Sequence, residues 1–323
     1  MNIESIYTYE LLGWIDEKKI NYEILSRNPY AIELLEKNPE KINWINLADN
    51  PNASRILEKN PEKILWRSLS ENANTTRLLE KNPENVCWYK LSKNPNAIEL
   101  LKKNPEKIDW EALSSNPNAI HLLEKNPEKI DWFYLSKNPN AIHMLEKNPE
   151  KIVWSMLSLN PNAIKLLENT PSKIEWVSLN TNPNAIDLLE KNQDKICWSI
   201  LSLNSGAIQL LKKNPSKISW FSLLQNPCAI ELIEKKLVNG KDKVNVDNFI
   251  LSQNPNAIEL LEKYPSYIDW DWVWSNPSIF KKKINYKYLY QRMNMIREEL
   301  MMKCMHPSRL ERWIEMGGDI DDF

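Results

Sequence analysis

Tryptophan recurs at a fixed interval of 22 residues over more than half of the 323-residue chain. It occupies nine equally spaced positions: Trp44, Trp66, Trp88, Trp110, Trp132, Trp154, Trp176, Trp198 and Trp220. Self-similarity at one fixed period is the signature of a repeat protein, in which each unit contacts only its neighbours. The repeat therefore has to be interpreted before any local motif.

A regular unit contains two Asn-Pro steps, as the unit from Asn116 to Lys137 shows. Asparagine is a favoured N-cap and proline suits the first helical position, so each step predicts the start of a helix. Proline also keeps the residue before it out of the α region, so that residue ends the preceding helix. We expect one helix from Pro117 to Lys125 and a second from Pro127 to Ser136, with Asn126 as the cap between them.

The apolar residues of these two helices predict a layered stack. The first helix has one broad apolar side, whereas the second places Trp132 and Leu135 on one side and Ile130 nearly opposite, so it must be covered from two directions. Helices of about eight residues, roughly 12 Å long, are not stable alone. We therefore predict an all-α fold, an α/α solenoid (superhelix) of about twelve two-helix repeats. We expect the solenoid to be elongated, with the tryptophans in its core.

The two ends of the chain depart from the repeat. Residues 1–27 are predicted to form an N-terminal capping unit, in which Tyr22 takes the tryptophan position and Leu11 and Leu12 echo the leucine pair of the first helix. Residues 28–286 hold the tandem repeats, with an insertion near 237–242.

Residues 287–323 are predicted to form a C-terminal helical cap and an acidic tail. His306-Pro307 marks the start of a short helix within this cap. A longer helix precedes it, with apolar residues at helical intervals: Leu289, Met293, Ile296, Leu300 and Met301.

Charge and cysteine content limit the possible functions. The 42 basic and 43 acidic side chains give a formal net charge of -1, whereas nucleic-acid partners demand a basic face. No stretch of 18 apolar residues and no signal-peptide pattern occurs, so we expect neither a membrane span nor secretion. Cys87 and Cys197 hold the same unit position five repeats apart, beyond disulfide reach. We expect an intracellular, reducing environment.

The repeat resembles a known pattern. The segments Asn94-Pro95-Asn96-Ala97-Ile98 and Asn104 to Ser114 are similar to the short Asn-Pro tandem repeats of proteins from nucleocytoplasmic large DNA viruses, the giant viruses. The closing segment, from Arg297 through His306-Pro307 to Asp322, resembles the end of the same proteins. The resemblance implies a viral protein in the cytoplasm of an infected host cell, and it implies no catalytic activity.

The two positions after each tryptophan vary, while the residues around them repeat. Variable residues on a constant scaffold are how repeat proteins carry recognition, and aromatic side chains and arginine are favoured anchors. The alternative is that these residues only adjust packing between layers. The candidate protein-binding residues at these two positions are Tyr89, Lys90, Glu111, Phe133, Tyr134 and Met156.

The sequence contains no motif that predicts catalysis, because it lacks a Gly-rich phosphate loop and a nucleophile elbow. His121 and His143 hold the same position in adjacent units. Layers of packed helices lie about 8–10 Å apart, too far for both imidazoles to bind one zinc ion. We expect no catalytic site, no metal and no cofactor.

These observations predict a non-enzymatic, monomeric protein-interaction scaffold or adaptor. Its partner is expected to be a host or viral protein, with no nucleic-acid and no membrane partner. One alternative is a structural or assembly component of a virus particle. A repeat-based nucleic-acid binder is the third, and the near-zero net charge disfavours it.

Overall fold

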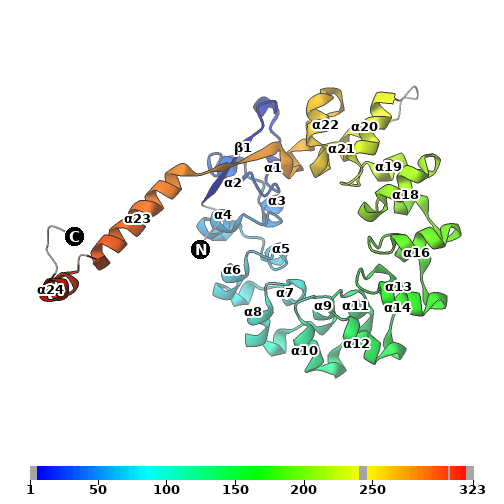
Figure 1. The fold of residues 1–323 in the computed structure, drawn as a ribbon, viewed down its shortest axis with the longest axis horizontal. Coiled ribbons are helices and arrows are strands. Elements are labelled where there is room, and N and C mark those ends of the chain that lie inside the picture. Colours follow the sequence, from blue (N-terminus) through cyan, green and yellow to red (C-terminus); the bar gives the residue numbers. More distant parts are fainter. Residues whose placement is uncertain (1–5, 240–245, 305, 318–323) are drawn as a thin grey trace. The chain divides into compact units, whose positions relative to one another are not determined.

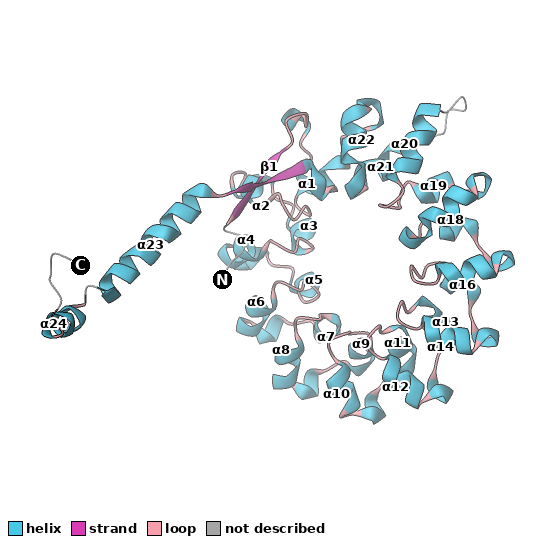
Figure 2. Ribbon diagram, in the orientation of Figure 1, coloured by secondary structure: helices cyan, strands magenta, loops and turns pink. Residues whose placement is uncertain are grey.

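The repeats fold as predicted, into an all-α solenoid of 22-residue layers (Figures 1 and 2). The computed structural model describes residues 6–239, 246–304 and 306–317. It divides the chain into two compact units. Gly13–Ile279 contains the repeats, and the second unit consists of Met1–Leu12 with Phe280–Phe323.

A regular layer contains three short helical segments. In the central layer these are α10 (Ile120–Glu124), a 3₁₀ turn (Pro127–Lys129) and α11 (Trp132–Lys137). The two predicted helices are therefore shorter than expected. The first Asn-Pro step forms a turn before α10, and the second begins the 3₁₀ turn rather than an α-helix.

The predicted cap role of Asn126 is wrong. Its Nδ2 donates to the carbonyl oxygen of Leu122, at 2.8 Å, and so satisfies the end of the preceding helix. The cap of α11 is Asp131, whose Oδ1 accepts from the backbone N–H of Tyr134 at 3.0 Å. A short acidic side chain at this position suits the free N–H groups of a first turn.

Two series of helices alternate along the repeat unit. The helices that begin at the tryptophan position lie on the inner side of a ring, as Figure 1 shows for α7, α9 and α11. These inner helices are α1 (Tyr22–Leu25), α3 (Trp44–Ala48), α5 (Trp66–Leu69), α7 (Trp88–Lys93), α9 (Trp110–Ser114), α11, α13 (Trp154–Leu159), α15 (Trp176–Leu179), α17 (Trp198–Leu201), α19 (Trp220–Leu223) and α21 (Asn248–Gln253). The outer helices are α2 (Ile32–Glu36), α4 (Ser54–Lys59), α6 (Thr76–Lys81), α8 (Ile98–Lys103), α10, α12 (Ile142–Lys147), α14 (Ile164–Asn169), α16 (Ile186–Lys191), α18 (Ile208–Lys213), α20 (Ile230–Asn239) and α22 (Ile258–Lys263).

The core lies between the two series and consists mainly of leucine and alanine. In the central layer Ala119, Leu123 and Leu135 are fully buried. The tryptophans of the 22-residue series are only half-buried, which corrects their expected place in the core. One face of the indole meets a cation of the next layer instead, because Lys151 Nζ lies 4.7 Å from the ring centroid of Trp132. An ammonium group over the face of an indole is attracted by the ring quadrupole.

A buried asparagine joins each layer to the one before it. Nδ2 of Asn138 donates to the carbonyl oxygens of Ser114, at 3.1 Å, and Asn116, at 3.0 Å, in the preceding layer. Its Oδ1 accepts from the backbone N–H of Asn140 at 3.0 Å. Chain corners leave carbonyl groups without helical partners, and an unpaired buried polar group costs about 1–3 kcal/mol. One amide therefore satisfies the corner and joins two layers.

The same pair of interlayer hydrogen bonds recurs through the described part of the array, and we call the series the asparagine ladder. At Asn254 the acceptors lie 28 and 30 residues earlier rather than 22 and 24, so the insertion does not interrupt the ladder. Twelve asparagines make these bonds: Asn28, Asn50, Asn72, Asn94, Asn116, Asn138, Asn160, Asn182, Asn204, Asn226, Asn254 and Asn276.

The ladder closes on itself. Nδ2 of Asn28, in the first layer, donates to the carbonyl oxygens of Trp274, at 3.0 Å, and Asn276, at 2.9 Å, in the last layer. The repeats therefore form a ring, visible in Figure 1. A closed circle of twelve layers requires a rotation of about 30° per layer. The expectation of an elongated solenoid is therefore wrong, because the first and last layers are joined.

The contact between lysine and an aromatic ring also continues across the junction. Lys19 Nζ lies 4.3 Å from the ring centroid of Trp270 in the last layer. Lys41 Nζ lies 4.7 Å from the ring centroid of Tyr22, which holds the tryptophan position as predicted. The asparagine hydrogen bonds and the lysine–aromatic contacts are therefore the same at the junction as between other layers.

The closing layer is assembled from both ends of the array. Its corner, Asn276 followed by a 3₁₀ turn (Pro277–Ile279), comes from the C-terminal side. Its other 3₁₀ turn (Glu17–Lys19) and α1 come from the N-terminal side. The truncated last repeat and the truncated first repeat thus make one layer. Part of the expected N-terminal capping unit, from Glu17 to Leu25, thus belongs to the array itself.

The second unit contains a two-stranded sheet and two helices. β1 (Tyr7–Leu11) pairs antiparallel with β2 (Phe280–Ile284). The predicted helical role of Leu11 is wrong, because the aromatic and β-branched residues of this segment favour a strand. α23 (Tyr286–Cys304) and α24 (Pro307–Glu315) agree with the predicted longer and shorter helices. Residues 240–245, which include the second half of the predicted insertion, and the acidic tail lie outside the described residues.

Replacing Asn138 by alanine tests the ladder. We expect Asn138→Ala to lower the free energy of unfolding by roughly 2–3 kcal/mol, because buried carbonyl groups lose their donor. Asn126→Ala, which removes one half-buried hydrogen bond within a layer, should cost about 1 kcal/mol. Urea unfolding of both variants measures the difference. Equal costs would show that the interlayer bonds of the ladder stabilise the fold no more than a hydrogen bond within one layer.

Replacing Asn28 by alanine tests the closure. In a ring, Asn28→Ala should cost as much as Asn138→Ala, because both remove the same two interlayer bonds. In an open stack the Nδ2 of Asn28 has no preceding layer to bind, so the substitution would cost far less. The two urea midpoints, measured side by side, distinguish the two arrangements.

Candidate functional site

The inner helices present one row of exposed side chains. We define the inner row as the residue directly after the tryptophan position in each layer. Its members are exposed except Ser155, which is half-buried. They are Glu23, Ile45, Arg67, Tyr89, Glu111, Phe133, Ser155, Val177, Ser199, Phe221, Phe249 and Asp271.

Apolar and polar members alternate along most of the inner row. Ile45 (68% exposed), Tyr89 (41%), Phe133 (45%), Val177 (57%) and Phe221 (61%) hold every second layer. Neighbouring inner helices contact each other directly, so a large side chain has more room beside a small or polar one. Large apolar side chains this exposed, on one side of one ring, indicate an interaction surface rather than a core.

The second position after each tryptophan packs between layers instead. Asn46 Nδ2 donates to the carbonyl oxygen of Glu23 at 2.8 Å, and Lys90 Nζ lies 2.6 Å from Glu71 Oε2 in the preceding layer. Ala112 at this position is fully buried. The two variable positions thus differ. The first is exposed on the inner helices, and the second packs between neighbouring layers.

The six candidate residues divide between these two positions. Tyr89, Glu111 and Phe133 belong to the exposed inner row, whereas Lys90, Tyr134 and Met156 are half-buried at the second position.

A hydrogen bond to Glu111 raises the pKa of the Tyr134 phenol above its usual range, because the carboxylate favours the protonated donor. The ring of Tyr134 also meets Phe133 edge to face, with centroids 5.3 Å apart.

Five consecutive inner helices form an arc without charge. α13, α15, α17, α19 and α21 contain no charged residue, whereas α1, α5, α7, α9 and α11 each contain at least one. We call these five helices, together with Leu203 just after α17, the uncharged arc. Its exposed apolar side chains are Val177 (57%), Leu203 (42%), Phe221 (61%) and Phe249 (39%).

The acidic residues beside this arc are engaged in capping. The carboxylate of Glu175 accepts from the backbone N–H groups of Val177, at 3.4 Å, and Ser178, at 2.7 Å. These bonds lower the pKa of Glu175, because they stabilise the ionised form. Asp247 Oδ1 likewise accepts from the N–H of Ile250 at 3.3 Å.

Sequence reasoning missed the uncharged arc. The candidate residues lie near the middle of the expected elongated stack, and a ring has no middle. The absence of Lys, Arg, Asp and Glu from the segments that start at Trp154, Trp176, Trp198 and Trp220 could have indicated it.

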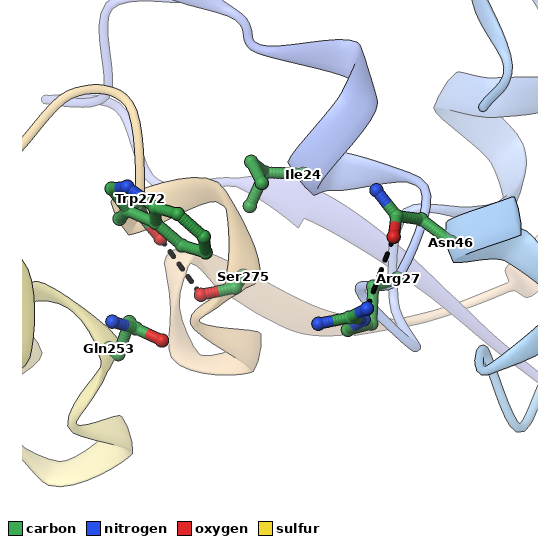
Figure 3. Close-up of a pocket in the computed structure, with 6 residues that line it drawn as sticks. All are labelled: Ile24, Arg27, Asn46, Gln253, Trp272 and Ser275. Carbon is green, nitrogen blue, oxygen red and sulfur yellow. Dashed lines mark hydrogen bonds between the residues drawn. The ribbon is translucent and has the colours of Figure 1, made fainter.

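A pocket of about 250 Å³ lies at the ring junction (Figure 3). Its charged lining residue, Arg27, is already paired: Nη2 donates to Asn46 Oδ1 at 3.1 Å and to Asp49 Oδ2 at 3.3 Å. On the other side of the pocket, Ser275 Oγ donates to the carbonyl oxygen of Trp272 at 2.8 Å. The pocket thus lacks a free charged group that could select a ligand.

The outer helices carry ion pairs between layers. Lys103 Nζ lies 3.3 Å from Glu80, and Lys213 Nζ lies 2.6 Å from Glu190, in both cases 23 residues apart. His143 Nε2 lies 2.8 Å from Glu124 Oε1. Exposed pairs of this kind contribute about 0–1 kcal/mol each. The described residues contain no group of three His, Cys, Asp or Glu side chains that could hold a metal ion.

Comparison with known proteins finds no match among family models, curated proteins or solved structures. Of the helices in the described residues, none is both long and apolar enough to cross a bilayer. Any proposal for the function of this protein therefore rests on the geometry of the chain itself.

Two substitutions in the helix α11 test the exposure of the inner row. Phe133→Ser should change the free energy of unfolding by only about 1 kcal/mol, because nearly half of the residue's surface is already in water. Leu135→Ala, in the same helix but fully buried, should cost about 2–5 kcal/mol. Comparable costs in thermal or urea unfolding would mean that Phe133 is a core residue.

Proposed function

We propose that this protein is a non-enzymatic scaffold or adaptor, which binds a segment of another protein on the inner side of its ring. One observation carries the proposal: five consecutive inner helices contain no charge, and three of them carry an exposed apolar side chain, Val177, Phe221 or Phe249. Large apolar side chains gathered on one exposed face mark protein-interaction sites, and aromatic side chains are favoured anchors within them.

The chemistry of the uncharged arc specifies the kind of partner. Phe221 and Val177, which are 61% and 57% exposed, would each contribute roughly 1–2 kcal/mol if a partner removed them from water completely. The arc offers little to a charged partner, because its neighbouring carboxylates already cap helices. The bound segment therefore presents apolar side chains, and its affinity depends weakly on salt.

The remaining inner row extends this face. Tyr89, Glu111 and Phe133 lie on inner helices of the same ring and are exposed, so a longer partner segment reaches them after docking on the arc. The second position instead contributes half-buried side chains to the packing between layers: Lys90, Tyr134 and Met156. The resemblance to giant-virus repeats favours a host or viral protein in an infected cell as the partner.

Photo-crosslinking tests where the partner binds. A benzophenone amino acid placed at Val177 or Phe221, in the uncharged arc, should capture the same protein from an infected-cell lysate. The matched control is the same probe at His121, an exposed residue of the outer helix α10. Mass spectrometry identifies the products, and capture from His121 alone would place the binding face on the outer side.

The captured protein then allows a measurement of affinity. Phe221→Ala should weaken binding at least fivefold, equivalent to about 1 kcal/mol, because an exposed aromatic anchor is lost. His121→Ala should leave affinity unchanged. Titration calorimetry at low and high salt completes the test, and a steep loss of affinity with salt would contradict docking on an uncharged surface.

A further inference from the structure

The helix α23 carries large apolar side chains that nothing in the second unit covers among the described residues. It spans 19 residues, from Tyr286 to Cys304, or about 28 Å at 1.5 Å per residue. Contiguous exposed apolar surface on one helix marks an interaction site. The exposed residues are Tyr286 (74%), Tyr290 (68%), Met293 (67%), Met295 (56%), Ile296 (53%), Leu300 (61%), Met301 (49%) and Met302 (67%).

Four apolar residues of α23 have the spacing of a coiled-coil seam. Leu289, Met293, Ile296 and Leu300 follow one another at intervals of four, three and four residues. This alternation keeps the side chains on one stripe that faces a partner helix. Met295 and Met302 lie on the opposite side of the helix, outside the stripe.

Three of the four residues beside the stripe are charged. Arg292 and Glu299 flank it on one side, and Tyr290 and Arg297 flank it on the other. Their order determines which partner helix can pair with α23, because flanking side chains set the direction and the choice of partner in a coiled coil.

A second copy of α23 fits this order in only one direction. In a parallel pair, Arg292 of one helix would face Arg297 of the other, which is repulsive. In an antiparallel pair, like flanks face each other. Arg292 then meets Glu299 of the second copy, and Tyr290 meets Arg297 of the second copy, twice each by symmetry. The first contact is an ion pair, and the second places a guanidinium beside an aromatic ring.

We propose that this protein forms a dimer through antiparallel pairing of α23 with α23 of a second copy. In this register Leu289 packs on Leu300 of the second copy, and Met293 packs on Ile296 of the second copy. Each chain supplies the same four residues, as a two-fold interface requires. The bond from Arg292 Nη1 to the Tyr288 hydroxyl, at 3.3 Å, is compatible because a guanidinium has five donors.

This inference replaces the monomer expected from the sequence, and it does not depend on the proposed function of the ring. The dimer would join two rings by helices that are separate from the uncharged arc in the chain. A scaffold with two rings holds two copies of its partner, so the inference would add bivalence to an adaptor.

Sedimentation equilibrium of the full-length protein tests the dimer. The parent chain should show a concentration-dependent dimer. Ile296→Glu, which puts a charge into the seam, should abolish it. Met295→Glu adds the same charge to the exposed opposite side of the same helix and should leave the dimer intact. Circular dichroism confirms that both variants keep their helices. A parent chain that stays monomeric overturns the proposal, and so does equal loss in both variants.

Charge reversal tests the direction of pairing. Arg292→Glu and Glu299→Arg each create like-charge contacts in an antiparallel pair, so each variant alone should dimerise about tenfold more weakly. An equimolar mixture of the two should recover dimers, because each of these contacts then joins a glutamate of one variant to an arginine of the other. Parallel pairing predicts the opposite for Arg292→Glu, which would strengthen the dimer by facing Arg297.

One further variant distinguishes dimerisation through α23 from binding at the uncharged arc. Phe221→Ser alters the uncharged arc and should leave the dimer constant unchanged. Loss of the dimer in Phe221→Ser would show that α23 binds the arc of another copy, and the antiparallel pair would be wrong. Loss of partner binding in Phe221→Ser with an intact dimer supports both proposals independently.

Discussion

The hydrogen bonds of one buried asparagine amide in each layer hold this structure together. Asn138 shows the arrangement: two Nδ2 bonds reach back to the preceding layer, and Oδ1 closes the corner of its own layer. Helices of four to six residues have few internal hydrogen bonds and need such support. The amide solves two problems together, because the carbonyl groups that it satisfies are those that the Asn-Pro corner leaves without partners.

The ring follows from repeating that bond without variation. An interface that is identical in every layer gives a constant rotation, and the array ends where the last layer meets the first. Asn28 meets Asn276 by the bond that joins neighbouring layers elsewhere. Closure also gives the ring two different faces. The inner helices crowd together and expose the inner row, whereas the outer helices separate and carry ion pairs.

The sequence predicts the layers well and their closure poorly. The 22-residue period, the buried leucines and the tyrosine in place of tryptophan at Tyr22 follow from spacing and helical geometry. Closure depends on a rotation per layer that no single unit reveals. The prediction of Asn126 as an N-cap rests on asparagine as an acceptor, but its amide donates to Leu122 instead. The uncharged arc is hard to predict because it is defined by the absence of charged residues and not by a motif.

The closure is tested most directly by a distance between residues that are far apart in sequence. Glu23 and Asp271 hold the same inner-row position in adjacent layers across the junction, as Arg67 and Tyr89 do within the array. Spin labels at each pair can be compared in a chain whose cysteines, Cys87, Cys197, Cys228 and Cys304, are replaced by serine. The ring predicts that both pairs give the same short distance, with layers about 10 Å apart. A long distance for the first pair alone would show an open array and contradict the ring.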